Sequence, residues 1–193
     1  MKENDKTSYA KRASVWWNEF RPRRADEATD PSRARADAGA FARLRRKQNA
    51  IDALIEPLTV SLIRRIGVFE QDEEAVCRAA ELAVLLAHVR QDDNEPVAAR
   101  LRGPNADTPV MSPLRFQRLL YAEAGSERLT AFRRAVAMLG GRANVHDLAN
   151  AYLNFDAPKA GQAIRVRWLL AYAGERTYSQ HTTQQTASNE DAA

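Results

Sequence analysis

Apolar residues recur along this chain at the spacing of helix faces, and no stretch alternates apolar and polar residues as a half-buried strand does. The clearest example spans 73–90, where Val76, Ala80 and Ala83 belong to one wide apolar face. Composition agrees, because 35 Ala and 17 Leu outnumber 11 Val and 5 Ile, and the first pair favours helix over strand. The sequence therefore predicts an all-α protein, a helical bundle of about seven to eight helices.

Turn-forming residues divide these helices into two small subdomains. The segment 91–111 contains three prolines and one glycine, which predicts a long Pro-rich linker loop. We therefore expect an N-terminal helical subdomain at 9–90 and a C-terminal helical subdomain at 112–174. The polar segment 175–193 is predicted to be a disordered tail.

The N-terminal subdomain is expected to begin with a short helix at 9–20. Its adjacent Trp16 and Trp17 cannot both face the same way, so one should pack inward and the other should cap a groove or a partner surface. The following segment, 21–36, carries two prolines and five arginines and is predicted to be a mobile basic connection.

Two aspartates are predicted to cap the next helices. Asp37 would start a helix that runs to about Ile55, and Asp72 would start the helix at 73–90. In the first of these helices, an apolar stripe at helical spacing is expected to face the core. Its members are Phe41, Leu44, Ile51 and Ile55.

The C-terminal subdomain has the clearest helix start. Ser112 and Pro113 place a capping residue before a proline at the first helical position, which predicts a helix to about residue 123. Leu114, Leu119 and Leu120 are expected to face inward from it. Further helices are predicted at 126–139, 144–155 and 158–173.

Residues suited to catalysis or metal binding are sparse. Cys77 is the single cysteine, so neither an internal disulfide nor a cysteine-based zinc site is possible. No phosphate-loop, dinucleotide-binding, metalloprotease or nucleophile-elbow motif occurs. We interpret the acidic cluster of Asp92, Asp93 and Glu95 as a solvated loop rather than a metal site. The sequence therefore predicts no catalytic residue, no bound metal and no cofactor.

The sequence also lacks signals for export or membrane insertion. The N-terminal stretch MKENDKTSYAKR is charged and has no apolar core behind it, unlike a signal peptide. No apolar run approaches the roughly 20 residues of a membrane span. We expect a cytoplasmic protein without a membrane partner.

Charge is unevenly distributed along the chain. The formal net charge is +6 over 1–47, −5 over 48–108, +5 over 109–176 and −2 over 177–193. Of the 29 Lys and Arg residues, 24 are Arg. Two basic blocks that flank an acidic middle predict a polarised surface.

Arginine suits phosphate binding, because its planar guanidinium forms two parallel hydrogen bonds and stacks on bases. Arg46 is predicted to lie nearly opposite the apolar stripe of the helix from Asp37 to Ile55. In the helix at 126–139, Arg134 points away from the apolar stripe, and Arg128 and Arg133 flank it. No helix is evidently built to read base edges. The sequence thus favours binding to nucleic-acid backbones without sequence reading. The candidate residues are Arg43, Arg45, Arg46, Lys47, Arg115, Arg118, Arg128, Arg133, Arg134, Arg165 and Arg167.

Six motifs in order resemble the CasB family, the small subunit of the type I-E CRISPR Cascade surveillance complex. They are W-W near the N-terminus, A-F-A-R-L-R-R (40–46), S-P-x-R-F-x-R-L-L (112–120), L-x-x-F-R-R-A-V-x-x-L (129–139), N-V-H-D-L-A (144–149) and V-R-W-L-L-A-Y (166–172). The resemblance covers roughly residues 12–173. It implies an all-helical fold of two small subdomains and no catalytic activity.

The resemblance also implies partners and site residues. Two copies of the chain would lie in a ribonucleoprotein with the backbone and large Cascade subunits, contacting the RNA-guided DNA target strand and steadying the displaced strand of the R-loop. The family's basic positions fall here on Arg45, Arg46, Arg115, Arg118, Arg133 and Arg134. Those carried over more loosely are Arg142, Lys159, Arg165 and Arg167.

Two other classes of function stay open at this point. Residues 144–172 could form a helix-turn-helix of a DNA-binding transcription regulator, which would prefer one duplex sequence over random DNA by at least about 10³. A protein–protein scaffold could instead use Trp16 or Trp17 and the acidic face of 48–108. Such a scaffold would not bind nucleic acid at any salt concentration.

Overall fold

The computed structural model describes residues 3–22, 30–68, 73–105 and 107–174. These residues form ten helices, eight of which have seven or more residues, and one pair of two-residue strands. The prediction of an all-α protein is therefore confirmed. The elements are α1 (Glu3–Phe20), α2 (Pro31–Arg45), α3 (Ala50–Leu54), α4 (Pro57–Ile66), α5 (Glu73–Ala87), β1 (Gln91–Asp92), α6 (Val97–Arg102), α7 (Pro113–Leu120), α8 (Ser126–Met138), β2 (Arg142–Ala143), α9 (Val145–Asn154) and α10 (Pro158–Ala173).

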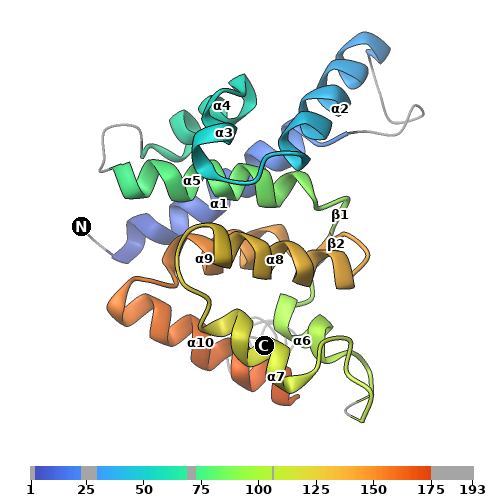
Figure 1. Cartoon of the computed structure of the whole chain (residues 1–193), viewed down its shortest axis with the longest axis vertical. Coiled ribbons are helices and arrows are strands. Elements are labelled where there is room, and N and C mark those ends of the chain that lie inside the picture. The colour runs from blue at the N-terminus through green and yellow to red at the C-terminus, as the bar shows by residue number, and fades with distance from the viewer. Residues whose placement is uncertain (1–2, 23–29, 69–72, 106, 175–193) are drawn as a thin grey trace, which may run out of the picture.

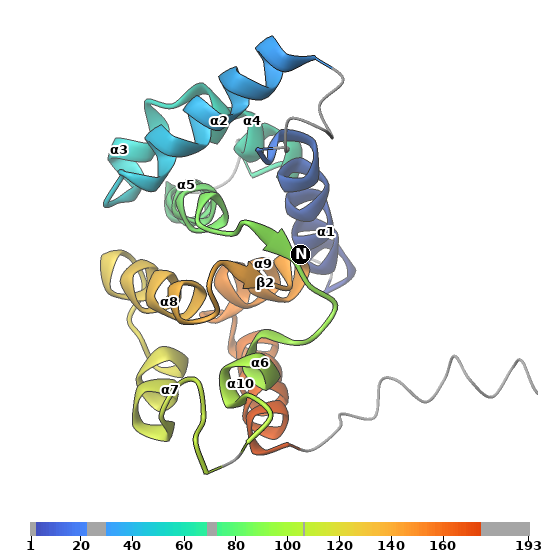
Figure 2. The same ribbon diagram turned by 90° about the vertical axis from the view of Figure 1, so that its right-hand side faces the viewer.

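The helices lie in layers, with α5 in the interior (Figures 1 and 2). On one side α5 packs against α2, α3 and α4, and on the other against α8 and α9, while α6, α7 and α10 form the far end. Residues 79–87 of α5 are all buried, as expected of a helix that is apolar on nearly every side. The buried residues form one continuous cluster, and the division into two subdomains stays a prediction.

Both tryptophans of α1 are buried, so the expectation that one of them faces a groove or partner is wrong. Trp16 stacks on Phe41 with ring centroids 5.9 Å apart. Trp17 is 2% exposed, and its Nε1 donates a hydrogen bond of 3.1 Å to the carbonyl oxygen of Leu86. Helix α1 packs against both α4 and α9, so two of its faces are covered rather than one.

The predicted helix from Asp37 to Ile55 is two helices with different boundaries. α2 begins at Pro31, after Asp30 accepts a hydrogen bond from the backbone N–H of Ser32, and Asp37 lies within it. The chain leaves the helix after Arg45, and Asn49 caps α3. This break resets the helical phase, so Ile51 and Ile55 are 67% and 76% exposed instead of buried.

The predicted linker 91–111 contains regular structure that sequence periodicity missed. β1 pairs in parallel with β2, and the short helix α6 buries Val97 and Leu101 and packs against α10. Asp147 of α9 accepts a hydrogen bond of 2.9 Å from the backbone N–H of Val97. Contacts from distant parts of the chain therefore order this segment, which a search for local patterns cannot detect.

Helix α7 starts at Pro113 as predicted but ends at Leu120 rather than near residue 123. Leu119 and Leu120 are buried, whereas Leu114 is 58% exposed, contrary to expectation. Phe116 takes the inward position instead and stacks on Tyr172, with ring centroids 4.0 Å apart.

Three sequence predictions concern positions outside the described residues: the cap at Asp72, the tail 175–193 and residues 23–29 of the basic connection. The prediction of a mobile connection is wrong for residues 31–36, which form the start of α2. Among the described helices, none combines the length and the apolar character needed to cross a bilayer.

Candidate nucleic-acid interface

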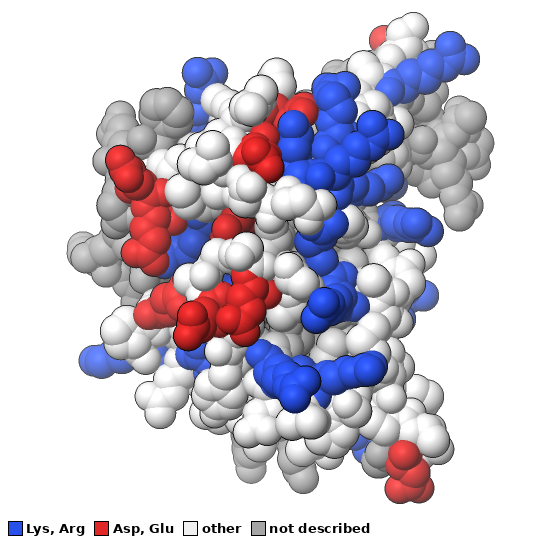
Figure 3. All heavy atoms as spheres, viewed as in Figure 1, with Lys and Arg blue, Asp and Glu red and all other residues white. Residues whose placement is uncertain are grey.

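Lys and Arg side chains gather in a band across one face of the molecule (Figure 3). The band runs from the end of α2 over α8 to α7, and acidic side chains collect on the other part of the same face. We call these residues the basic band: Arg43, Arg45, Arg46, Lys47, Arg115, Arg118, Arg133 and Arg134. The fold thus brings together cations from both basic blocks of the sequence.

Two cations of the band share one carboxylate. Nε of Arg43 lies 2.9 Å from Glu56 Oε2, and Nζ of Lys47 lies 3.1 Å from Glu56 Oε1. Burial raises the pKa of Glu56, but the hydrogen bonds from Arg43 and Lys47 outweigh burial and lower the pKa overall. Glu56 therefore stays ionised and offsets part of the positive charge at this end of the band.

Arg45 and Arg133 brace the end of α2. Nε of Arg45 donates to the carbonyl oxygen of Ala87 at 2.6 Å, which ties α2 to α5. Arg133 of α8 donates to the carbonyl oxygens of Lys47 and Arg45 at 3.3 and 3.4 Å, and to Oε1 of Gln48 at 3.2 Å. Burial and the nearby Arg90 lower the pKa of Arg45. Both residues thus serve the fold as well as the surface charge.

Four arginines of the band project into solvent: Arg46, Arg115, Arg118 and Arg134. Within the described part of the chain, no hydrogen bond or ion pair engages their guanidinium groups. Helical spacing had placed Arg134 away from its apolar stripe, in agreement with this exposure. Arg46 is exposed as well, but it follows the last residue of α2, so the predicted stripe does not explain its exposure. Each keeps a full set of donors for an external phosphate.

One cation beside the band was not among the predicted residues. Arg90 follows α5, is exposed and lies close enough to Arg45 to lower the pKa of Arg45. Its stem packs against Gly141, where an added Cβ would lie 3.1 Å from Cγ of Arg90. The sequence signal was weak, because Arg90 is the last residue of the predicted helix at 73–90 and directly precedes the predicted linker.

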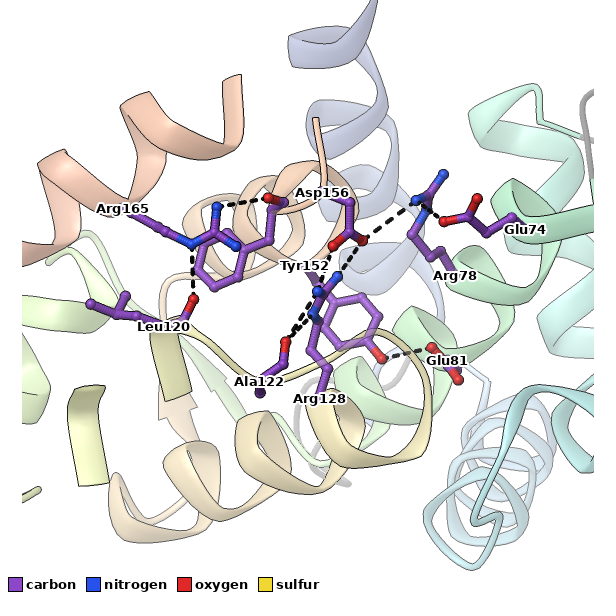
Figure 4. A network of polar contacts seen from close by, with 10 residues as sticks. Glu74, Arg78, Glu81, Leu120, Ala122, Arg128, Tyr152, Asp156 and Arg165 are labelled. Atoms are coloured by element: carbon purple, nitrogen blue, oxygen red, sulfur yellow. Dashed lines mark hydrogen bonds and ion pairs between the residues drawn. The ribbon is translucent and has the colours of Figure 1, made fainter. Parts of the chain in front are cut away.

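Arg128 lies inside the protein rather than on the band (Figure 4). Its guanidinium binds both carboxylate oxygens of Asp156 at 2.5 and 2.6 Å, and its Nη2 donates to the carbonyl oxygen of Ala122 at 3.1 Å. Arg78 bridges the same aspartate to Glu74, at 3.5 and 2.7 Å. The predicted contact of Arg128 with nucleic acid stays untested, and its geometry is that of an internal brace.

Three of the four remaining predicted residues are engaged within the protein. Arg165 donates to the carbonyl oxygens of Leu120 and Phe155, both at 2.9 Å. Arg142 pairs with Asp93 at 2.6 Å and Arg167 with Asp147 at 2.8 Å. Lys159 is exposed in the first turn of α10, at the opposite end of that helix from its contact with α6 and α7 (Figure 1).

The acidic cluster after β1 organises the backbone. Asp92 accepts from the N–H of Val145 at 2.9 Å. Asp93 accepts from the N–H of Glu95 and pairs with Arg142 and Arg100; these interactions outweigh burial and lower its pKa. Across the described residues, no group of three or more His, Cys, Asp or Glu side chains is arranged to hold a metal ion.

A hollow of about 330 Å³ opens beside the band, where the segment after α2 faces α8. Its lining comprises Gln48, His88, Thr130, Arg133, Arg134 and Ala137. Burial, together with the charges of Arg133 and Arg45, lowers the pKa of His88 to about 4. The histidine is therefore neutral at physiological pH, in a setting that is otherwise cationic.

His88 should make the protein less stable in mild acid. The unfolded chain protonates this residue near the ordinary pKa of 6.5, whereas the folded chain does so only near a pKa of about 4. Between these values the unfolded state binds more protons, so falling pH favours unfolding. We expect this group to lower the free energy of unfolding by about 2 kcal/mol between pH 7 and pH 5, measured by urea denaturation.

A pair of histidine variants isolates this effect from the carboxylates. His88→Gln should lose most of the acid sensitivity, while His146→Gln, at an exposed position of α9, should keep it. Glu81 acts in the opposite direction, because burial raises its pKa, and both variants retain it. Equal acid sensitivity in the two variants would contradict the assignment to His88.

Comparison with known proteins identifies the family. The model of CRISPR-associated protein Cse2 matches residues 40–172. The chain belongs to the Cse2 family. This family, also called CasB, is the non-catalytic small subunit of type I-E Cascade, which confirms the resemblance found in the sequence.

Two solved structures share the fold. CasB from Thermus thermophilus is 19% identical, with a TM-score of 0.59 over 86% of this chain and 97% of that one. A chain of the E. coli Cascade structure bound to a PAM-containing dsDNA target is 14% identical, with a TM-score of 0.55 over 84% of this chain and 97% of that one. No curated protein matches the chain in sequence.

The segment matched by the Cse2 model contains the whole basic band and leaves α1 outside. Helix α1 is nevertheless part of the same core, since Trp16 and Trp17 are buried against the matched segment. The band therefore lies on the portion of this protein that defines it as a Cse2 chain.

Proposed function

We propose that this Cse2 subunit binds sugar–phosphate backbones along the basic band and so stabilises the target strand and the displaced strand of the R-loop. The observation that carries the proposal is the gathering of exposed, unpaired arginines from three separate elements into one band. Such guanidinium groups bind phosphates without reading bases.

The energetics of R-loop formation suit a subunit of this kind. Exchanging a DNA duplex for an RNA–DNA duplex is nearly balanced, so a few backbone contacts from protein can tip it. A displaced strand needs a positively charged track rather than a base code. The band supplies such a track with no chemical step.

The regulator alternative finds little support in the C-terminal helices. Most of α9 is buried, so it is not available to enter a groove. On α10, Arg165 and Arg167 bond within the protein, and Val166, Leu169 and Leu170 are large apolar side chains that are exposed. An exposed helix bearing polar side chains for base edges is what major-groove recognition requires.

The proposed partners are the backbone and large subunits of Cascade, a second copy of this chain, and the RNA-guided DNA. The family assignment and the fold shared with a DNA-bound Cascade chain support them. The scaffold alternative loses its proposed tryptophan contact, because Trp16 and Trp17 are buried, and keeps only the acidic face of 48–108.

Strand binding by the purified chain tests the proposal. We expect the affinity for single-stranded DNA to vary by less than about tenfold among unrelated sequences and to fall steeply with salt. Fluorescence anisotropy with labelled oligonucleotides measures both. A preference of about 10³ for one duplex would indicate a regulator instead, and absence of binding at low salt would favour the scaffold.

Assembly is tested separately by co-expression. The chain should co-purify with a CRISPR RNA and the other Cascade subunits supplied from the same operon. A folded chain that binds strands yet never joins such a complex would refute the proposed partners while leaving the backbone binding in place.

A further inference from the structure

The hollow beside the basic band contains hydrogen-bonding groups that the fold does not use. The backbone of Arg45 lies close to His88 and favours the protonated form of its ring, although burial outweighs this effect and lowers the pKa. Nε2 of His88 is buried and has no hydrogen-bond partner among the described residues. A neutral imidazole carries one N–H and one bare acceptor nitrogen, so with the proton on Nδ1 the buried Nε2 is an acceptor.

The other side of the hollow offers donors. Of the five N–H groups of Arg133, three are used on Arg45, Lys47 and Gln48. Its two other N–H groups, and all five of Arg134, meet no acceptor in the described part of the chain. A buried acceptor thus lies near a cluster of cationic donors.

A ligand that satisfies both features carries an N–H donor and an anion on one small frame. A nucleotide has both, because every base presents N–H groups on its Watson–Crick edge and is joined to a phosphate. The volume of about 330 Å³ lies at the lower end of the range for ligand pockets, which suits a single nucleotide.

We infer that this hollow takes up one nucleotide of a bound strand, with a base N–H donating to Nε2 of His88 and the adjoining phosphate lying on Arg133 and Arg134. The inference rests on the proposed function, since it assumes a strand along the band. Such a site would fix the position of one nucleotide on a surface that otherwise binds the sugar–phosphate backbone in any register. Thr130, exposed at the rim, offers a hydroxyl to either part of the nucleotide.

The imidazole signals of the ¹⁵N-histidine-labelled full chain test this placement. A ten-nucleotide deoxycytidine strand should shift Nε2 of His88, whereas a ten-unit abasic strand of the same charge should not. The exposed His146 serves as the internal reference and should respond to neither strand.

Each other result overturns a defined part of the argument. Equal shifts of His88 with both strands would mean that only phosphate enters the hollow. Binding of both strands with no shift of His88 would reject the nucleotide site and leave the proposed backbone binding intact. Failure of both strands to bind would reject the proposed function itself.

Filling the hollow gives a second test without changing charge. Ala137→Leu should weaken binding of the deoxycytidine strand about tenfold, as expected when one base loses its site, and should leave the abasic strand unaffected. Ala163→Leu, at an exposed position of α10, is the matched control and should change neither affinity. Undiminished affinity of the Ala137→Leu variant would overturn the inference.

Discussion

Replacing Arg128 by alanine should lower the free energy of unfolding by about 3 kcal/mol, the largest single-residue effect we expect in this protein. The Arg128 side chain is 3% exposed and holds Asp156 and the carbonyl oxygen of Ala122 at once. Its removal leaves a cavity, an unpaired carbonyl group and a carboxylate with only the more distant Arg78. Urea denaturation measures the loss as a lower midpoint at an unchanged slope.

The same network explains why charge, and not only volume, matters at this position. The hydrogen bond from Arg128 lowers the pKa of Asp156, so this pairing stabilises the fold above the ordinary carboxyl range and is lost as pH falls through the lowered pKa. Tyr152 donates to buried Glu81 at 2.9 Å, and the charge of Arg128 partly offsets the effect of burial on the pKa of Glu81 (Figure 4). Arg128→Ala therefore also removes a positive charge that favours the ionised form of the buried Glu81 carboxyl group.

Arg134→Ala is the matched control, on the same helix and exposed. It should change the free energy of unfolding by no more than about 0.5 kcal/mol. Strand affinity should respond in the reverse order, falling for Arg134→Ala and persisting for Arg128→Ala at a temperature where that variant is folded. Equal stabilities for the two variants would contradict the internal role of Arg128. A loss of strand binding by Arg128→Ala alone would indicate that Arg128 contacts the nucleic acid.

Local signals in the sequence predicted the longer helices well. Pro113, Gly125 and Asn144 lie where α7, α8 and α9 begin, because capping residues and a proline at the first position act within one turn. Helix α6 was missed and α3 was merged with α2 into one predicted helix, since neither α3 nor α6 is long enough to show a periodic stripe of its own. Both depend on burial against distant helices, which local sequence patterns do not contain.

The arginines of the candidate site were likewise predicted only where their orientation follows from local sequence. Helical phase correctly predicted that Arg134 points away from the core, because its position follows from the stripe of its own helix. Arg128 flanks that stripe, and whether a flanking arginine is exposed depends on what packs beside it. Here the partner is Asp156, which comes from the turn between α9 and α10, so only the tertiary fold distinguishes a brace from a ligand-binding residue.

A variant that removes one exposed cation from each element of the basic band should weaken single-strand binding about 10²-fold near 0.1 M salt. Its substitutions are Arg46→Gln, Arg118→Gln and Arg134→Gln. Each phosphate contact contributes about 0.7 to the slope of log K against log salt on a single strand, so three lost contacts should reduce that slope by about 2. Anisotropy titrations at several salt concentrations give both quantities, and urea denaturation should show a stability close to that of the unaltered chain.

A control with the same change in net charge separates the band from bulk electrostatics. Lys11→Gln on α1, Arg35→Gln near the start of α2 and Lys159→Gln in the first turn of α10 remove three exposed cations outside the basic band. Both variants lower the formal net charge from +4 to +1, so a surface that attracts strands only through total charge would respond equally to the two. If the band contacts phosphates directly, the affinity for a single strand should instead fall about 10²-fold in the first variant and less than about threefold in the second. The reason is that exposed charges more than about 10 Å from the strand are largely screened at this salt concentration.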